Sequence, residues 1–260
     1  MGWDGEWYCR AFDDEGNPVG SSRNAECRID SIAQSWAVLS GAGDPQKIER
    51  AVRSVEKHLI LRDEGLILLF TPPFQETPAD PGYIKAYLPG IRENGGQYNH
   101  AAIWMLCAYC QLGQPEKAYR ILQMINPVAR TATPEMLEKY RLEPYVVAAD
   151  IYSHITHPGR GGWSWYTGSA AWLYRAVVEY VLGFQLRNDR LTVSPCIPAD
   201  WPQFEIRYRR GKEAFQIRVD NPNRSGKGVR RLTYNGNVQE ANIVLLDPNE
   251  SNHSIQVELL

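Results

Sequence analysis

The sequence predicts a mainly α-helical domain followed by a β sandwich, and a change in apolar spacing near residue 188 supports this prediction. Before that point, apolar residues recur every three to four positions, as on one face of a helix. After it, apolar and polar residues alternate, as in strands with one buried face. We therefore expect a helical domain in residues 1–188 and an antiparallel β-sandwich domain in residues 189–260.

The helical part is expected to consist of helical hairpins. Pro45 suits the first turn of a helix, and the glycines at 41 and 43 end the helix before it. Long connections, rich in glycine, proline and aromatic residues, alternate with short ones. This pattern predicts about half of a six-hairpin α/α barrel. The helices are expected at 24–40, 45–58, 98–112, 115–125 and 168–182.

The C-terminal part shows its period of two most clearly around a turn at Gly211 and Lys212. Phe204, Ile206 and Tyr208 alternate with polar residues before this turn, and a similar alternation follows it. The expected strands are 190–197, 204–208, 215–219, 231–234, 243–246 and 255–260.

Bulk properties exclude several classes of protein. The net charge of -2 does not indicate a protein that binds nucleic acid through a basic surface. No apolar run reaches the roughly 18 residues of a membrane helix, and the first residues do not resemble a signal peptide. Five cysteines, an odd number at irregular spacing, predict free thiols and a cytoplasmic chain. Neither metal-ligand spacing nor a nucleotide-binding loop occurs, so we expect no metal and no organic cofactor.

The first polar motif places Asp4 between Trp3 and Trp7. Burial beside tryptophans raises the pKa of a carboxyl group, which suits a general acid. The alternative is a loop carboxylate that caps the turn at Gly5.

The second motif, residues 89–100, combines Arg92, Glu93, Gln97 and His100 with three glycines close to a helix start. Glycines allow the backbone to approach a ligand closely, and the density of polar groups favours a binding site. The alternative is a polar turn with a helix cap, in which His100 is a satisfied core histidine.

The third motif, residues 159–170, ends where an apolar helix begins. Thr167 and the free N–H groups from Gly168 onward are suited to hold an anion, helped by the helix dipole. Thr167 is equally suited to be a plain N-cap. A fourth motif, residues 143–152, either shapes a sugar site or contributes Asp150 as a buried structural acid.

Together these motifs favour phosphorolysis of a glycoside. Glycoside hydrolysis normally uses two carboxylates, one of which activates water or attacks carbon. A phosphorylase needs only the acid, because phosphate is the nucleophile. One acid and an anion cradle fit the second reaction.

Three runs resemble glycoside hydrolase family 94: WDGEWYCRAFDDEGNPVGS, PGIRENGGQYNHAAIW and GGWSWYTGSAAWLYR. The run EPYVVAADIYSHITHPGRGGWSWYTGSA is most similar to the cyclic β-1,2-glucan synthase branch of that family. The resemblance implies that Asp4 is the general acid and that Trp3 lines the sugar site. It also implies sugar contacts from Arg92, Glu93 and Gln97. The residues implied to bind phosphate are His100, Thr167 and the backbone of Gly168.

The implied reaction is inverting phosphorolysis of a β-glucan, expected to be β-1,2-linked, to α-glucose 1-phosphate. Inorganic phosphate is then a co-substrate, and the activity would control chain length in cyclic glucan synthesis. The resemblance places a β sandwich and half of the barrel before Asp4. We therefore expect self-association or contact with that N-terminal half, in a parent anchored to the inner membrane. The alternatives are a catalytically incomplete binding or structural module, and a hydrolase using Glu93 or Asp150.

Overall fold

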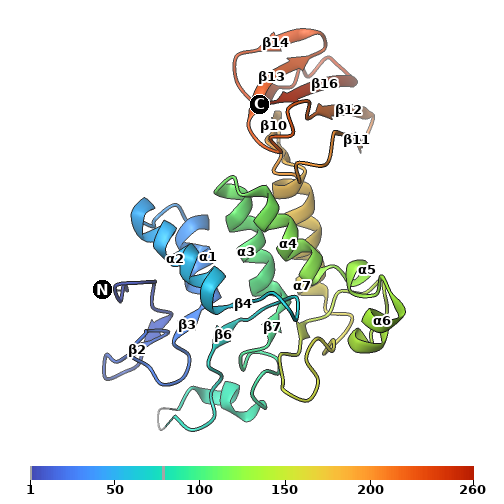
Figure 1. Ribbon diagram of the computed structural model, residues 1–260. Helices are drawn as coiled ribbons and strands as arrows, with labels where there is room; N and C mark the ends of the chain where they lie inside the picture. Colours follow the sequence, from blue (N-terminus) through green and yellow to red (C-terminus); the bar gives the residue numbers. More distant parts are fainter. Residues whose placement is uncertain (1, 78–79) are drawn as a thin grey trace. The chain divides into compact units, whose positions relative to one another are not determined.

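A computed structural model describes residues 2–77 and 80–260 (Figure 1). The chain forms two compact units. Unit 1 comprises Met1–Ala108 and Arg120–Leu173, and unit 2 comprises Tyr109–Tyr119 and Tyr174–Leu260. The domain boundary at residue 188 stays a prediction.

The helices agree closely with the sequence pattern. The predictions 45–58 and 115–125 are confirmed to the residue, and the prediction 98–112 is one residue too long at each end. Two short α-helices between residues 127 and 140 and a 3-10 helix at residues 82–86 were missed. The α-helices of the described residues are α1 (Ser31–Leu39), α2 (Pro45–His58), α3 (Asn99–Gln111), α4 (Pro115–Ile125), α5 (Pro127–Arg130), α6 (Pro134–Tyr140) and α7 (Thr167–Arg175). A 3-10 helix η1 (Gly82–Ala86) and a π-helical segment η2 (Ala176–Val181) accompany them.

Helix α1 is shorter than predicted because Asp30 caps it. The Asp30 side chain accepts a hydrogen bond from the Ile32 N–H, which fixes the start of the helix at Ser31. The preceding residues Ile29–Asp30 form strand β3 instead, paired with Phe70–Thr71 of β6. The apolar residues that the sequence pattern assigned to one face of a single helix therefore belong to two elements, β3 and α1.

Helix α3 supplies much of the core of unit 1. It is apolar on nearly all sides, which is typical of a helix surrounded by protein. The buried residues that it contributes to this unit include Ala101, Ala102, Ile103, Met105 and Leu106.

Short antiparallel strand pairs fix the long connections of unit 1. Each pair is two residues long, too short to give a periodic signal in the sequence. In Figure 1, β3, β6 and β7 lie near one end of α1 and α3. The pairs are β1 (Ala11–Phe12) with β2 (Pro18–Val19), β3 (Ile29–Asp30) with β6 (Phe70–Thr71), β4 (Ile60–Leu61) with β5 (Leu66–Ile67), and β7 (Gln97–Tyr98) with β8 (Asp150–Ile151).

Unit 2 contains two sheets. The three-stranded sheet has the order β15-β10-β9 and the five-stranded sheet the order β11-β12-β16-β13-β14. The strands are β9 (Phe184–Arg187), β10 (Arg190–Val193), β11 (Gln203–Arg210), β12 (Glu213–Asp220), β13 (Val229–Tyr234), β14 (Asn237–Gln239), β15 (Ile243–Leu245) and β16 (Asn252–Leu259).

Two features of the fold differ from the prediction. Strands β12 and β16 pair in parallel, so the larger sheet is mixed and not purely antiparallel. The protein is also not mainly helical, with 30% helix and 26% strand. The sequence pattern missed β9, β14 and the two-residue pairs, which raise the strand content. The barrel and the sandwich stay predictions.

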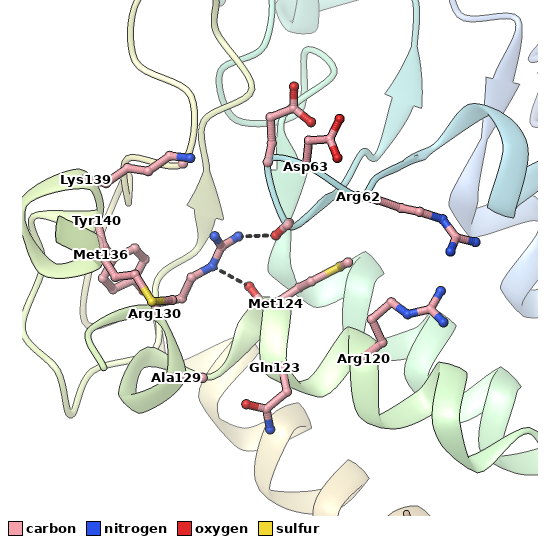
Figure 2. Close-up of a pocket in the computed structure, with 13 residues that line it drawn as sticks. Arg62, Asp63, Arg120, Gln123, Met124, Ala129, Arg130, Met136, Lys139 and Tyr140 are labelled. Carbon is pink, nitrogen blue, oxygen red and sulfur yellow. Dashed lines mark hydrogen bonds between the residues drawn. The ribbon is translucent and has the colours of Figure 1, made fainter. Parts of the chain in front are cut away.

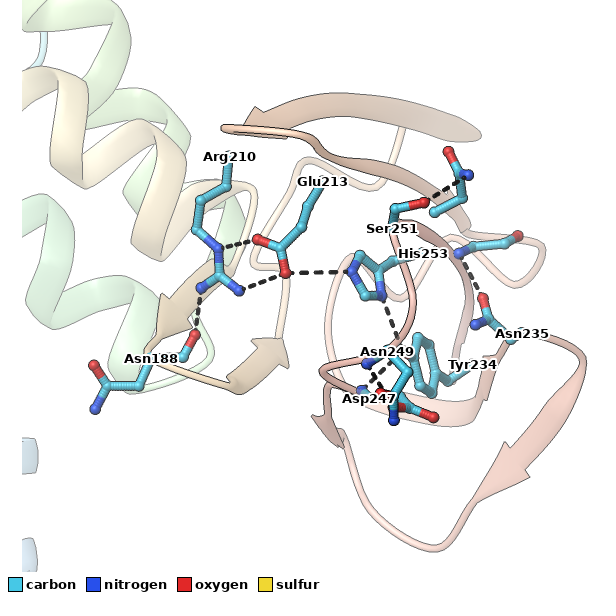
Figure 3. Close-up of polar contacts among 11 residues, drawn as sticks. Asn188, Arg210, Glu213, Tyr234, Asn235, Asp247, Asn249, Ser251 and His253 are labelled. Atoms are coloured by element: carbon cyan, nitrogen blue, oxygen red, sulfur yellow. Dashed lines mark hydrogen bonds and ion pairs between the residues drawn. The ribbon is translucent and has the colours of Figure 1, made fainter.

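A polar network is enclosed in unit 2 (Figure 3). His253 of β16 is buried between the rings of Phe215 and Tyr234, and its Nδ1 lies 2.9 Å from the Tyr234 hydroxyl. Glu213 lies 3.8 Å from the other ring nitrogen of His253 and pairs with Arg210. The network therefore links β16 to both of its neighbours and to the β11–β12 hairpin.

We expect Gly183→Ala to lower the free energy of unfolding by about 2 kcal/mol. Gly183 has φ +69°, and a Cβ there would lie 2.2 Å from the backbone carbonyl of Ser194. Gly211→Ala is the matched control, because Gly211 has φ +62° but nothing lies within 4 Å of its Cβ position. Urea unfolding of both variants separates the cost of the left-handed backbone, which both share, from the cost of the contact with Ser194, which only Gly183→Ala makes. Equal losses of unfolding free energy in the two variants would contradict a cost from that contact.

Candidate active site

The Asp4 carboxylate accepts hydrogen bonds from four groups. Its Oδ1 accepts from the backbone N–H groups of Glu6 and Trp7, at 3.0 and 3.1 Å. Its Oδ2 accepts from the Ser22 N–H at 2.6 Å and from the Ser21 hydroxyl at 3.2 Å. This carboxylate therefore organises the turn that carries the first motif, as in the capping alternative.

The expectation of a raised Asp4 pKa is wrong for this conformation. Burial raises the pKa, but backbone hydrogen bonds from Ser22, Glu6 and Trp7 outweigh it and hold the pKa below 3.8. The ring of Trp3 packs edge-on against that of Tyr8, with the ring centres 5.0 Å apart. Proton donation by Asp4 thus requires that some of these hydrogen bonds be released.

Arg92 is held by aromatic rings. Its guanidinium lies 4.8 Å from the ring centre of Trp163 and 5.3 Å from that of Tyr87, so two aromatic rings are within cation–π distance of the cation. The Tyr87 hydroxyl also lies 3.3 Å from its Nη1. Arg92 has φ 49°, a left-handed conformation that is unusual outside glycine and asparagine. The surrounding contacts hold this strained backbone, as is typical of functional positions.

Asp150 joins the second motif to the third. Its carboxylate accepts from the Arg92 N–H at 2.9 Å and from the Trp163 N–H at 3.3 Å. Gly162 is required beside it, because a Cβ there would lie 2.2 Å from Oδ1. Burial raises the pKa of Asp150 despite these hydrogen bonds. Of the two interpretations left open above, the structure supports the buried structural acid.

The starts of α3 and α7 meet at one carbonyl. The Ala148 oxygen accepts from the Asn99 side-chain amide at 2.8 Å and from the Ser169 hydroxyl at 2.9 Å. Asn99 and Ser169 directly adjoin the predicted phosphate residues His100 and Gly168. The second and third motifs therefore converge, as a shared anion site requires.

Two buried polar atoms near this convergence have no hydrogen-bond partner. They are His100 Nε2 and Glu93 Oε2. Burial lowers the pKa of His100, so its imidazole is neutral near pH 7 and retains one N–H donor. Such atoms are rare in folded proteins and are typical of sites that await a ligand.

The α7 start remains open to a ligand. Thr167 is exposed, and the first N–H groups of the nine-residue helix have no acceptor within the helix. Gly168 has the ring of Tyr166 beside it, 3.3 Å from where a Cβ would lie. A helix N-terminus of this kind is suited to bind an anion; the binding of phosphate by His100, Thr167 and Gly168 stays a prediction.

Gln97 is placed differently from its predicted substrate contact. It is fully buried; its oxygen accepts from the Ile67 N–H at 3.0 Å. Its amide nitrogen donates to Asn99 and to the Met124 carbonyl, at 2.9 and 3.0 Å. All of these partners lie in the protein core. Gln97 therefore supports the start of α3 and does not face a substrate.

Hydrogen bonds join the second, third and fourth motifs to one another. All hydrogen bonds of the Asp4 side chain within the described residues go to positions 6–22. Sequence reasoning missed Tyr87 and Trp163 as partners of Arg92. The many aromatic residues around the motifs indicate that such contacts are present, but they do not predict which ring lies beside which cation.

We expect Asp150→Asn to lower the free energy of unfolding by about 2 kcal/mol. The amide keeps the size of the carboxylate, yet turns an NH₂ donor toward one of two N–H groups, from Arg92 or Trp163. Urea unfolding, followed by tryptophan fluorescence, measures the loss. The exposed Asp14→Asn is the control. An unchanged midpoint in Asp150→Asn would contradict the role of the charged carboxylate as a double acceptor.

The fold and these motifs indicate a class: a protein with a helix-containing unit whose loops bring together polar and aromatic side chains suited to a polar ligand. Residues 1–183 match the family model described as the catalytic domain of the glycosyl hydrolase 94 superfamily. The chain belongs to this family.

Three relatives agree with the family model. The chain is 49% identical to the cyclic beta-(1,2)-glucan synthase NdvB of Rhizobium meliloti (strain 1021), over 88% of this chain and 8% of the synthase. It is 34% identical to an N,N'-diacetylchitobiose phosphorylase of Vibrio proteolyticus, over 90% of this chain and 29% of that protein. It is 31% identical to a solabiose phosphorylase of Paenibacillus borealis, over 99% of this chain and 33% of that protein. The chain thus spans about a third or less of these relatives.

The names of the same relatives are names of enzymes. Two are phosphorylases and one is a glucan synthase. Within the described residues, none of the helices has the length and apolar character needed to cross a membrane.

Proposed function

We propose that this chain carries part of the active site of an inverting phosphorylase that converts β-1,2-linked glucan and inorganic phosphate to α-glucose 1-phosphate. The observation that supports it most is the convergence of unpartnered His100 with the open start of α7, in a chain similar to phosphorylases. The β-1,2 linkage rests on the 49% identity with the glucan synthase.

In the proposed mechanism, His100, Thr167 and the Gly168 N–H hold phosphate beside the anomeric carbon. Phosphate attacks from the face opposite the leaving group, so the β-glucoside yields the α-phosphate. Asp4 gives its proton to the departing glycosidic oxygen. Asp4 must therefore be protonated before it acts, which requires the release of hydrogen bonds such as that from the Ser22 N–H.

Arg92 and Glu93 are proposed to hold the leaving sugar. The Tyr87 and Trp163 rings fix the direction of the guanidinium, which donates to sugar hydroxyls. The unpartnered Glu93 Oε2 is an acceptor for such a hydroxyl. Trp3, the residue before Asp4, is proposed to line the sugar site.

The assay incubates the chain with β-1,2-gluco-oligosaccharides and phosphate and measures glucose 1-phosphate. Phosphate-dependent formation of this product supports the proposal. Free glucose formed without phosphate would instead indicate hydrolysis. Absence of both products from the longest folded chain containing these residues would overturn it.

Sugar binding without turnover is the second candidate. It is favoured by the exposed aromatic side chains of Tyr145, Trp163 and Trp165, whose exposed fractions are 73%, 60% and 68%. Such rings stack on the C–H faces of sugars. Quenching of tryptophan fluorescence by the oligosaccharide, with no glucose 1-phosphate formed, would favour this function.

A further inference from the structure

A second cavity lies within unit 1, apart from the residues assigned above. It has a volume of about 630 Å³ and is bounded by the turn between β4 and β5, the C-terminal half of α4, α5 and α6 (Figure 2). Cavities of this size hold small organic ligands and exceed the needs of a single inorganic ion.

A buried cation lies at the base of this cavity. Arg130 is 8% exposed, and burial lowers its pKa to about 10. Its Nε donates to the Met124 carbonyl at 2.8 Å and its Nη2 to the Gly65 carbonyl at 2.6 Å. A guanidinium has five N–H groups, so these two bonds leave donors free. Among the described residues, Arg130 forms no ion pair with a carboxylate, and burial of an uncompensated charge is costly.

A buried hydroxyl accompanies this cation. Tyr140 lines the same cavity, is 1% exposed, and its hydroxyl has no hydrogen-bond partner. Buried hydroxyls without partners are uncommon and require an explanation. Arg130 and Tyr140 thus place unsatisfied N–H and O–H donors among the residues that line one cavity.

The rim of the cavity carries both signs of charge. Lys139 lies on the α6 side, where Figure 2 shows its side chain on the same side of the cavity as the Arg130 guanidinium. Arg62 and Arg120 share one carboxylate, Glu56, at 3.3 and 3.5 Å. Asp63 and the neighbouring Glu64 belong to the β4–β5 turn. The cations suit a phosphate group, and the carboxylates are acceptors for hydroxyl groups.

We propose that this cavity binds a phosphorylated monosaccharide. The phosphate group contacts Arg130 and Lys139, and the sugar hydroxyls face Asp63 and Glu64. This site is separate from the proposed phosphate site at His100 and Thr167, so its occupancy does not depend on turnover.

Isothermal titration calorimetry tests the proposal with four probes: glucose 6-phosphate, glucose 1-phosphate, inorganic phosphate and glucose. We expect at least one sugar phosphate to bind, inorganic phosphate to bind more weakly, and glucose to give no heat. Lys139→Gln should weaken sugar-phosphate binding about tenfold, and Arg130→Met should abolish it. Lys212→Gln, which removes a lysine from the β11–β12 turn of unit 2, should leave binding unchanged.

A double variant, His100→Ala with Thr167→Ala, separates the two sites. Sugar-phosphate binding that persists in it supports the second cavity, whereas its loss would place the ligand at the first site and overturn the proposal. Absence of sugar-phosphate binding by the unmodified chain would overturn it too. Circular dichroism checks the fold of each variant. If Arg130→Met is unfolded, Lys139→Gln decides: unchanged affinity there would overturn the proposal.

Discussion

Asp4→Asn is expected to reduce phosphorolysis by about 10²–10⁴-fold, the usual contribution of a general acid. The amide cannot supply a proton, so the leaving sugar must depart as an alkoxide. Formation of glucose 1-phosphate, measured as kcat and KM in the longest active chain containing these residues, gives the effect. The loss should appear in kcat, because the acid acts in the transition state.

The fold of this variant must be checked, because Asp4 also organises its loop. Asparagine still offers one acceptor oxygen to Glu6 and Trp7, but its NH₂ faces the Ser22 N–H. Urea unfolding should therefore show only a modest loss of about 1 kcal/mol. Asp14→Asn, an exposed change in the same motif, should retain activity. If Asp4→Asn keeps its kcat within about threefold, Asp4 is not the acid.

Local patterns predicted the helices well because helix signals are local. Pro45 and Pro115 each mark a first helical turn, and α2 and α4 begin there. The helix cap at Asp30 is a local signal too, but it was missed because apolar residues at helical spacing continue on both sides of it. The parallel pairing of β12 with β16 joins segments more than thirty residues apart, beyond the reach of a periodic signal.

The sequence predicted which residues belong to the candidate site but not the contacts that they make in the folded chain. The sequence pattern singled out Arg92, His100 and Thr167; of the residues near them, Asn99 and Ser169 both donate to the Ala148 carbonyl. It did not predict the low pKa of Asp4, because the strongest donor, Ser22, comes from a separate turn. Residue types reveal which chemistry is available, whereas the pKa of each group depends on long-range contacts.

Arg10→Met is expected to lower the free energy of unfolding at pH 7 by about 3 kcal/mol, the lower end for a broken buried ion pair. Arg10 pairs with Asp30, whose side chain is fully buried beneath it. Loss of the guanidinium leaves the carboxylate with only the N-terminal N–H groups of α1, such as that of Ile32. Methionine retains much of the apolar volume of arginine, so the loss reflects charge more than packing.

The pH dependence of this loss identifies its cause. Burial raises the pKa of Asp30 above 3.8 even with Arg10 present, and loss of Arg10 raises it further. The folded state of the variant therefore binds a proton more readily than the unfolded chain. As pH falls from 7 through that raised pKa, the variant regains stability relative to the parent.

Urea unfolding at pH 7 and pH 5 should thus show a smaller defect at pH 5. A double variant, Arg10→Met with Asp30→Asn, tests the same cause at one pH. Asparagine caps a helix about as well as aspartate but carries no charge, so most of the lost stability should return at pH 7. An equally large defect in the double variant would instead assign the loss to packing around Arg10, and the buried carboxylate would then not be the reason that Arg10 is needed.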